Sequence, residues 1–300
     1  MERMQLTEEL SFSRFVHGLW RLSDWNLSKE KTLSLMTEAY EQGITTFDHA
    51  DIYGGYTCEE RFGEALALNP SFREKIEIVT KCGIVLESSN RPLHKSHHYN
   101  TSKAHIIDSV ERSLQSLHTD YIDVLLIHRP DPMMDPTEVA EAFRTLKSDG
   151  KVRAFGVSNF KDHQLNMLQS YVDDKLITNQ IEVSPYELEN VDDGTLNHCL
   201  ENRIAPMAWS PLAGGRLFTG EDEKSIRLRE TLTKVSKEIE ANSIDQVAYA
   251  WILNHPAKIM PIIGSGNIER IKGALASSEL ELSLDQWFEI LHSSMGHDVP

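Results

Sequence analysis

The amino-acid sequence predicts an α/β protein, a single (β/α)8 TIM barrel over residues 1–300 with an extra C-terminal helix. Short apolar runs rich in β-forming residues alternate with longer segments whose apolar residues recur every three or four positions. This alternation continues almost to the C-terminus and yields eight strands, the number that closes such a barrel. The length also suits two average domains, but because no linker or low-complexity break interrupts the chain, one domain is favoured.

Strands such as Val124–Ile127 and Met260–Ile263 are apolar without strict alternation, as is typical of parallel strands buried on both faces. In chain order the expected strands are Phe15–Leu22, Thr45–Ala50, Ile76–Lys81, Ile122–His128, Ala154–Ser158, Asn179–Val183, Pro206–Ser210 and Met260–Gly264. The segments with helical periodicity, which would form the outer ring, include Lys29–Gln42, Cys58–Leu68, Ala104–Leu117, Val139–Ser148 and Lys161–Val172.

Three segments do not fit this repeat. Val85–Thr101 and Leu212–Ser225 follow the third and seventh strands, so we expect long binding loops at the C-terminal mouth, where barrel active sites lie. The amphipathic stretch Ser283–Ser294 predicts the extra helix, packed on the outside of the barrel or across its bottom.

The composition excludes several classes of protein. A formal charge of −16 argues against a broad nucleic-acid surface, which needs clustered lysine and arginine. The three cysteines lie far apart without metal-site or disulfide-framework spacing. Met1–Leu10 lacks an apolar signal core and no stretch is long enough for a membrane span, so we expect a cytoplasmic protein.

Four ionisable side chains fall at or just beyond successive strand ends: Asp48, Tyr53, Lys81 and His128. Each has a plain structural interpretation, since Asp often begins a turn, an exposed Lys is common and a histidine after a strand is often a hydrogen-bonded structural residue. Their coincidence at one mouth of the predicted barrel indicates an active site instead.

The motifs around these residues are similar to those of a known family. TFDHADIYG (46–54), VTKCG (79–83) and LLIHRPDP (125–132) resemble the active-site motifs of the aldo-keto reductases. The similarity extends through GKVRAFGVSNF (150–160), NQIEVSP (179–185) and AWSPLAGG (208–215), and is greatest to bacterial general oxidoreductases. It implies an NADPH-dependent reductase of small carbonyl substrates with Asp48, Tyr53, Lys81 and His128 as its catalytic tetrad.

The chemistry of carbonyl reduction suits these four side chains. Hydride addition builds negative charge on the carbonyl oxygen, which must receive a proton in the transition state. We expect Tyr53 to donate it, helped by the positive charge of Lys81, which lowers the pKa of a phenol. Asp48 would hold Lys81 ionised and in place, and His128 would orient the carbonyl oxygen. No metal is required.

The resemblance also implies a set of nicotinamide cofactor residues. Ser158, Asn159 and Gln180 match the family's carboxamide ligands. Trp209 stands where many members have a stacking tyrosine and keeps the aromatic face; plain core filling is the less favoured alternative.

For the diphosphate, the segment Ser210–Leu217 offers small residues and one cation, through Ser210, Leu212, Gly214 and Arg216. At the entrance of a later helix stand Gly264, Ser265 and Gly266, whose amides can receive phosphate. Arg270 resembles the family's ligand for the adenosine 2′-phosphate, which favours NADPH over NADH. Many relatives have a lysine where this chain has Gly264, so one positive contact is lost.

Other residues carry weaker signals. We expect Trp20 and His49, and with less support Trp25, to line the substrate pocket. The histidines of LHKSHHY (93–99), namely His94, His97 and His98, are better suited to border that pocket than to bind a metal, because no carboxylate or cysteine shares their spacing. Cys82 is either redox-sensitive or a small buried filler.

Two rival functions stay open at this point. A nucleotide-binding regulatory protein on the same barrel, with little turnover, would keep the fold but is disfavoured by the intact tetrad. A metal-dependent barrel hydrolase would need histidine and carboxylate ligands at several strand ends, and only His128 and Asp48 offer any. The natural substrate and the oligomeric state are not readable from the sequence.

Overall fold

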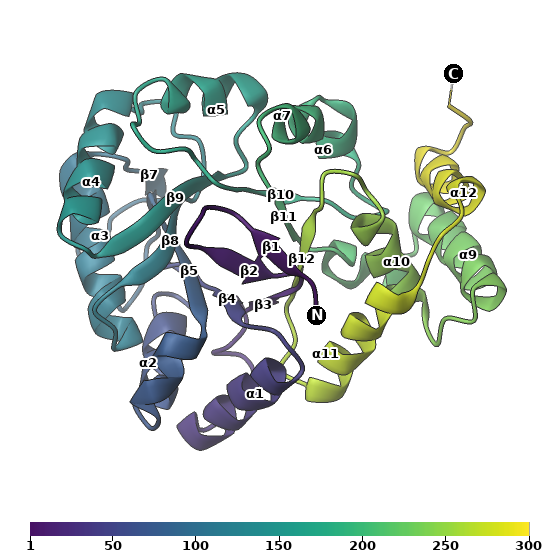
Figure 1. Cartoon of the computed structure of the whole chain (residues 1–300), viewed down its shortest axis with the longest axis horizontal. Helices are drawn as coiled ribbons and strands as arrows, with labels where there is room; N and C mark the ends of the chain where they lie inside the picture. The colour runs from purple at the N-terminus through teal and green to yellow at the C-terminus, as the bar shows by residue number, and fades with distance from the viewer. Residues whose placement is uncertain (300) are drawn as a thin grey trace. The chain divides into compact units, whose positions relative to one another are not determined.

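The computed structural model describes residues 1–299, and eight parallel strands close into one barrel (Figure 1). The predicted fold class is therefore confirmed, and each expected strand is present. Around the barrel the strands are β10 (Asn179–Glu182), β11 (Met207–Trp209), β12 (Met260–Ile263), β3 (Val16–Gly18), β4 (Thr46–Asp48), β5 (Glu77–Cys82), β8 (Ile122–Ile127) and β9 (Val152–Ser158).

The expected helices are also present, with boundaries a few residues different. They are α1 (Lys29–Glu41), α2 (Cys58–Leu66), α3 (Lys103–Leu117), α4 (Pro136–Ser148), α5 (Asp162–Gln169), α11 (Ile268–Leu275) and α12 (Leu284–Met295). The structure also contains helices that were not specifically predicted: α6 (Glu189–Asp192), α7 (Thr195–Glu201), α8 (Arg216–Thr219), α9 (Glu223–Glu238) and α10 (Ile244–Leu253). Short 3-10 helices cover Pro70–Lys75, Ala213–Gly215 and Ala276–Glu279. No helix among residues 1–299 combines the length and the apolar character that crossing a membrane would need.

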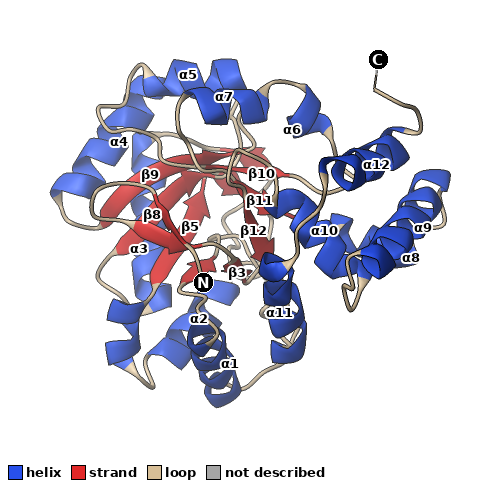
Figure 2. Ribbon diagram, turned by 45° about the vertical axis from the view of Figure 1, so that its right-hand side comes forward, coloured by secondary structure: helices blue, strands red, loops and turns tan. Residues whose placement is uncertain are grey.

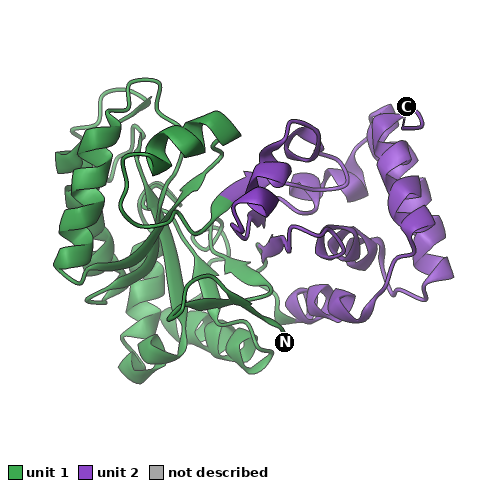
Figure 3. Ribbon diagram, turned by 45° about the horizontal axis from the view of Figure 1, so that its top comes forward, with its two compact units in different colours: residues 1–179, 264–268 green, residues 180–263, 269–300 purple. Residues whose placement is uncertain are grey.

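The chain divides into two compact units, coloured in Figure 3. The first comprises residues 1–179 and 264–268, and the second comprises residues 180–263 and 269–300. In the first unit, helices such as α3 and α4 flank the strands, as Figure 2 shows. A buried core that includes Phe47, Phe62 and Ile78 packs between the strands and α2. That residues 1–300 form a single domain stays a prediction.

The second unit has its own apolar core, which explains the extra C-terminal helix. Trp251 of α10 and Trp287 of α12 stack with ring centroids 4.9 Å apart. Each indole N–H donates to the other residue's backbone carbonyl, at 3.1 and 3.0 Å. Because Trp251 is buried, Trp287 is partly buried and each indole satisfies its only donor, this pair holds α12 on α10.

A short antiparallel hairpin at the N-terminus, β1 (Arg3–Gln5) and β2 (Ser11–Ser13), was not predicted. Its strands are three residues long and largely polar, so they carry no clear periodic signal. Ser13 Oγ accepts the backbone N–H groups of Thr45 and Thr46 at 3.1 and 3.2 Å, and Arg3 pairs with Glu77 at 2.6 Å. The hairpin therefore covers the amino ends of β4 and β5, opposite the strand ends that carry the candidate site.

The long segment 85–101 is partly ordered by a second hairpin, β6 (Ile84–Val85) with β7 (His98–Tyr99). In the second expected loop, 212–225, the structure places the 3-10 helix at 213–215, all of α8 and the start of α9. The first segment follows β5 and the second follows β11, as predicted.

Candidate active site

A buried lysine forms the centre of the candidate site. Lys81 lies near the end of β5 with none of its side chain exposed. Its Nζ donates to both carboxylate oxygens of Asp48, at 2.8 and 2.9 Å, and to the backbone carbonyl of His49 at 2.6 Å. A further bond of 3.0 Å reaches the hydroxyl of Tyr53. The parallel pairing of β4 with β5 produces this cluster, because Asp48 lies opposite Val79, two residues before Lys81.

The charge of Lys81 is set by two opposing effects. Burial lowers the pKa of the ammonium, but the Asp48 carboxylate and the Tyr53 hydroxyl outweigh it, and the net shift is upward. Lys81 is therefore a permanent cation at neutral pH, and the carboxylate beside it compensates a charge that would otherwise be costly to bury.

Tyr53 lies in the turn after β4, with its hydroxyl oxygen as the acceptor of the Lys81 hydrogen bond. Its own hydroxyl hydrogen is therefore not used by Lys81. Burial raises the pKa of Tyr53 above the usual value, and the charge of Lys81 lowers it only in part. Lys81 therefore acts on the pKa of Tyr53 in the expected direction, but burial has the larger effect.

His128 follows β8 and joins the same group. Its backbone N–H donates to the Cys82 carbonyl at 2.9 Å, and its ring meets that of Tyr53 edge to face with centroids 5.9 Å apart. Its Nδ1 is buried and has no hydrogen-bond partner within residues 1–299. Burial, then the charges of Lys81 and Arg129, hold the pKa well below its ordinary value, so the imidazole is neutral.

Two of the expected carboxamide ligands adjoin His128. Ser158 ends β9 and is buried, while Asn159 has a left-handed backbone with φ of 61°. The Asn159 amide donates to Ser158 Oγ at 2.8 Å and to the His128 carbonyl at 3.4 Å. A non-glycine residue in this conformation is uncommon and often marks a functional position.

Gly264, Ser265 and Gly266, the residues expected to receive phosphate, also belong to the first unit, and a histidine that sequence reasoning missed contacts them. His17 of β3 donates through Nε2 to the Ser265 carbonyl at 2.9 Å and stacks on Trp25. A Cβ on Gly266 would come within 2.6 Å of the Trp25 ring, whereas one on Gly264 would meet nothing within 4 Å. Trp25 therefore packs against Gly266. The signal for His17 was a lone polar residue inside an apolar strand.

The other expected cofactor residues lie in the second unit, described here by itself. Gln180 is in β10 and Trp209 ends β11; Arg270 is exposed in α11. The segment that follows β11 and leads into α8 contains Ser210, Leu212, Gly214 and Arg216. Its backbone is left-handed at Ser210 (φ 49°) and Gly214 (φ 63°). A Cβ on Gly214 would meet nothing within 4 Å, so the space beside it is open.

His49, which was expected to line the substrate pocket, is not exposed in the structure. His49 is fully buried and packs edge to face on Phe62 of α2, with centroids 4.4 Å apart. Successive residues of an extended chain point to opposite sides, so with Asp48 facing Lys81 the next side chain must face α2. Trp20, in contrast, is 58% exposed and free to line a pocket.

The histidines of 93–99 and Cys82, which carried weaker signals, differ in their exposure and contacts. His97 and His98 are exposed, whereas His94 contacts Tyr56. Among residues 1–299 no three His, Cys, Asp or Glu side chains gather closely enough for a metal ion. Burial raises the pKa of Cys82 well above its ordinary value, which favours the interpretation as a buried filler.

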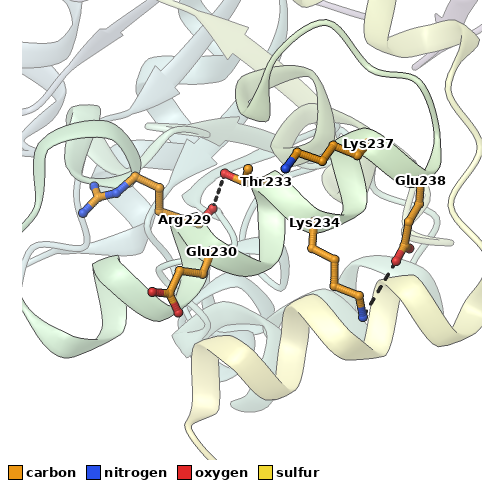
Figure 4. A pocket seen from close by; sticks show the side chains of 6 residues that line it. All are labelled: Arg229, Glu230, Thr233, Lys234, Lys237 and Glu238. Carbon is orange, nitrogen blue, oxygen red and sulfur yellow. Dashed lines mark hydrogen bonds and ion pairs between the residues drawn. The ribbon is translucent and has the colours of Figure 1, made fainter.

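A shallow hollow on α9 of the second unit, drawn in Figure 4, contains none of the predicted site residues. All six lining residues lie on α9: Lys234 lies 3.8 Å from Glu238 and 2.7 Å from Glu289 of α12, and the Thr233 hydroxyl donates to the Arg229 carbonyl at 2.6 Å. This hollow is a solvated helix face.

The model of the aldo/keto reductase family matches residues 14–293. The chain belongs to this family. The uncharacterized oxidoreductase YcsN of Bacillus subtilis is 63% identical to it over the full length of both chains.

Two further relatives and one solved structure extend the comparison. Oxidoreductase YdhF of Escherichia coli is 51% identical over 96% of both chains, and a 6-dehydroglucose reductase of Agrobacterium fabrum is 43% identical over all of both. The structure of the thermostable aldo-keto reductase Tm1743 with the inhibitor epalrestat matches with a TM-score of 0.82 at 26% identity, covering 98% of this chain and 100% of that one.

Proposed function

We propose that this aldo/keto reductase reduces aldehydes and ketones to alcohols with NADPH, and that Tyr53 is the general acid. The observation that carries the proposal is the hydrogen bond of 3.0 Å from Lys81 Nζ to the Tyr53 oxygen. Because the tyrosine accepts this bond, its own hydrogen is available to a substrate oxygen. The raised pKa of Tyr53 keeps that hydrogen in place at neutral pH before reaction.

The four side chains then act together: Tyr53 and His128 on the carbonyl oxygen, and Lys81 and Asp48 on Tyr53. As negative charge grows on the carbonyl oxygen, the Tyr53 O–H transfers its proton to it. The phenolate left behind is stabilised by the ammonium of Lys81, which Asp48 holds in place through two hydrogen bonds. His128, neutral and edge to face with Tyr53, donates a hydrogen bond that orients the same oxygen.

The cofactor part of the proposal rests on the character of the residues. NADPH, when bound, would supply the hydride. Ser158, Asn159 and Gln180 would hold its carboxamide, and Trp209 would provide a flat surface for the nicotinamide. The open glycines Gly214 and Gly264, together with Ser210, Leu212, Ser265 and Gly266, offer room and amides for phosphate. Arg216 and Arg270 are exposed cations suited to the phosphate charges.

The substrate is proposed to be a small carbonyl compound. The name of the Agrobacterium relative, 43% identical over the whole chain, makes 6-dehydroglucose a worthwhile member of a substrate panel. No observation on residues 1–299 favours the alternative of a regulatory barrel with little turnover.

Replacing Tyr53 with Phe tests the central proposal. With NADPH and an aldehyde in excess, we expect kcat of Tyr53→Phe to fall by about 10²- to 10⁴-fold, because the variant has no proton to donate. The Kd for NADPH, followed by tryptophan fluorescence, should stay within about twofold. Tyr99→Phe, which changes an exposed tyrosine on β7, is the matched control. Undiminished turnover by Tyr53→Phe would remove Tyr53 from its role.

Cofactor choice needs a separate measurement. Fluorescence titration of the wild-type protein should give a lower Kd for NADPH than for NADH. Arg270→Ala should weaken NADPH binding by about 10-fold, the scale of one charge-assisted hydrogen bond, and leave NADH nearly unaffected. Tighter binding of NADH by the wild type would contradict the NADPH assignment.

A further inference from the structure

The segment 86–97 packs against the turn that carries Tyr53. This turn has three consecutive left-handed residues, Gly54 (φ 60°), Gly55 (φ 62°) and Tyr56 (φ 73°). Left-handed backbone is ordinary for glycine but disfavoured for tyrosine. Contacts made by the Tyr56 side chain therefore have to compensate for its backbone conformation.

The Tyr56 hydroxyl makes those contacts with the ends of the segment. It accepts the backbone N–H of Leu86 at 2.8 Å and donates to the Leu86 carbonyl at 3.4 Å. His94 Nδ1 lies 3.1 Å from the same carbonyl and 3.3 Å from the hydroxyl. A carbonyl oxygen only accepts, so His94 carries its hydrogen on Nδ1. One phenol thus connects the start of the segment to a residue eight positions later.

The backbone of the turn supplies a second attachment. The Gly55 carbonyl accepts Ser88 Oγ at 3.1 Å and the Asn90 amide at 2.9 Å. The guanidinium carbon of Arg91 lies 4.9 Å from the centre of the Tyr56 ring. The segment is therefore an ordered wall, fastened within three residues of Tyr53.

We propose that Tyr56 is a positioning residue that fastens segment 86–97 as one wall of the substrate site and thereby sets substrate affinity. The proposal rests on the proposed carbonyl reduction at Tyr53. A substituent on the carbonyl compound would contact this wall, at whose tip the Leu93 side chain is 88% exposed. Lys81 holds Tyr53 independently at 3.0 Å, so loosening the wall changes binding while the proton-transfer step is kept.

The test is Tyr56→Phe, which keeps the ring and removes only the hydroxyl. We expect KM for 4-nitrobenzaldehyde to rise about 3- to 10-fold, the worth of one or two hydrogen bonds, with kcat within about twofold. Hydrogen exchange of the amides in 86–97 should accelerate by a similar factor. Tyr99→Phe is the matched control: it lies on the hairpin that carries the segment, outside residues 86–97, and its side chain is exposed. It should leave both measurements unchanged.

A double-mutant cycle with His94→Ala provides the second readout. If the hydroxyl and the imidazole act as one fastening, the rise in KM of the double variant will be smaller than the product of the single effects. Unchanged exchange in Tyr56→Phe, or a loss of kcat at constant KM, would overturn the proposal. Failure of the proposed function looks different: the wild type and Tyr99→Phe would reduce no carbonyl compound, while the exchange measurement would still report on the fastening.

Discussion

Carboxylates are buried on both sides of the β4–β5 region, but in opposite electrostatic settings. On the side away from α2, Asp48 lies against the ammonium of Lys81 at 2.8 Å. On the side that packs against α2, the carboxylate of Glu59, a residue of α2, accepts a hydrogen bond from the Thr80 hydroxyl at 2.6 Å. Within residues 1–299 Glu59 makes no ion pair. Asp51, near Glu59, has a buried oxygen, Oδ1, without a hydrogen-bond partner in that same range.

The consequence is a difference in ionisation. Burial raises the pKa of Glu59 to about 7, and burial followed by the charge of Glu59 raises the pKa of Asp51 well above its ordinary value. Lys81, in contrast, is held as a cation by Asp48. A buried carboxyl without a cation takes up a proton, whereas a buried ion pair stays charged. The charged pair of Asp48 and Lys81 thus lies on the side of β4 and β5 that is proposed for chemistry. The titratable carboxyl groups, Glu59 of α2 and Asp51 after β4, lie apart from that pair.

The largest effect on stability is expected from removing Lys81, the cation of the buried pair with Asp48. Lys81→Met leaves Asp48 buried without its partner and should lower the free energy of unfolding by about 3–5 kcal/mol, measured by urea denaturation at pH 7. The control Lys103→Met breaks an exposed pair with Glu141 and should cost at most about 1 kcal/mol. Because Asp48→Asn in the Lys81→Met background removes the stranded charge, the double variant should recover part of the loss. If the two lysine substitutions lowered the free energy of unfolding equally, the carboxylate of Asp48 would not depend on Lys81 for compensation of its charge.

A smaller effect is expected on the titratable side. Glu59 has a higher pKa in the folded protein, about 7, than its ordinary 4.5, so the folded state binds its proton more tightly. Stability from this group is complete below pH 4.5 and is lost as the pH rises to 7, by about 3 kcal/mol. Glu59→Gln should remove this loss, seen as a flatter dependence of the unfolding free energy on pH between 5 and 8. Glu60→Gln, an exposed neighbour on α2, should keep the wild-type slope. A wild-type slope in Glu59→Gln would show that Glu59 ionises normally.

The smallest effect is expected at His49, on the same side as Glu59. Both of its ring nitrogens are buried without a partner in residues 1–299, and burial holds its pKa well below the ordinary value. His49→Leu should change the unfolding free energy at pH 7 by less than about 1.5 kcal/mol and leave kcat within about twofold. His128→Leu, the same substitution across the strands, should lower kcat about 100-fold by removing the group that orients the oxygen. A comparable loss of kcat in His49→Leu would show that His49 contributes to the substrate pocket.

Much of this arrangement could be predicted before the structure. The eight strands followed from apolar runs such as 122–127, and the clustering of Asp48, Lys81 and His128 followed from their places at strand ends. The N-terminal hairpin could not be predicted, because three-residue polar strands carry no periodicity. Nor could the fastening of segment 86–97, since Tyr56 and His94 are 38 residues apart.

By itself, the sequence determined the order of strands and helices and the identity of the groups that meet at Lys81. Periodicity and strand-end position are local properties, and a parallel barrel brings its strand ends together whatever the details of packing. The tertiary structure alone decided the side to which His49 turns, the buried partners of each carboxyl and the net direction of the Tyr53 pKa. These depend on desolvation and on charges brought within a few ångströms by segments far apart in the chain, and no local pattern encodes that sum.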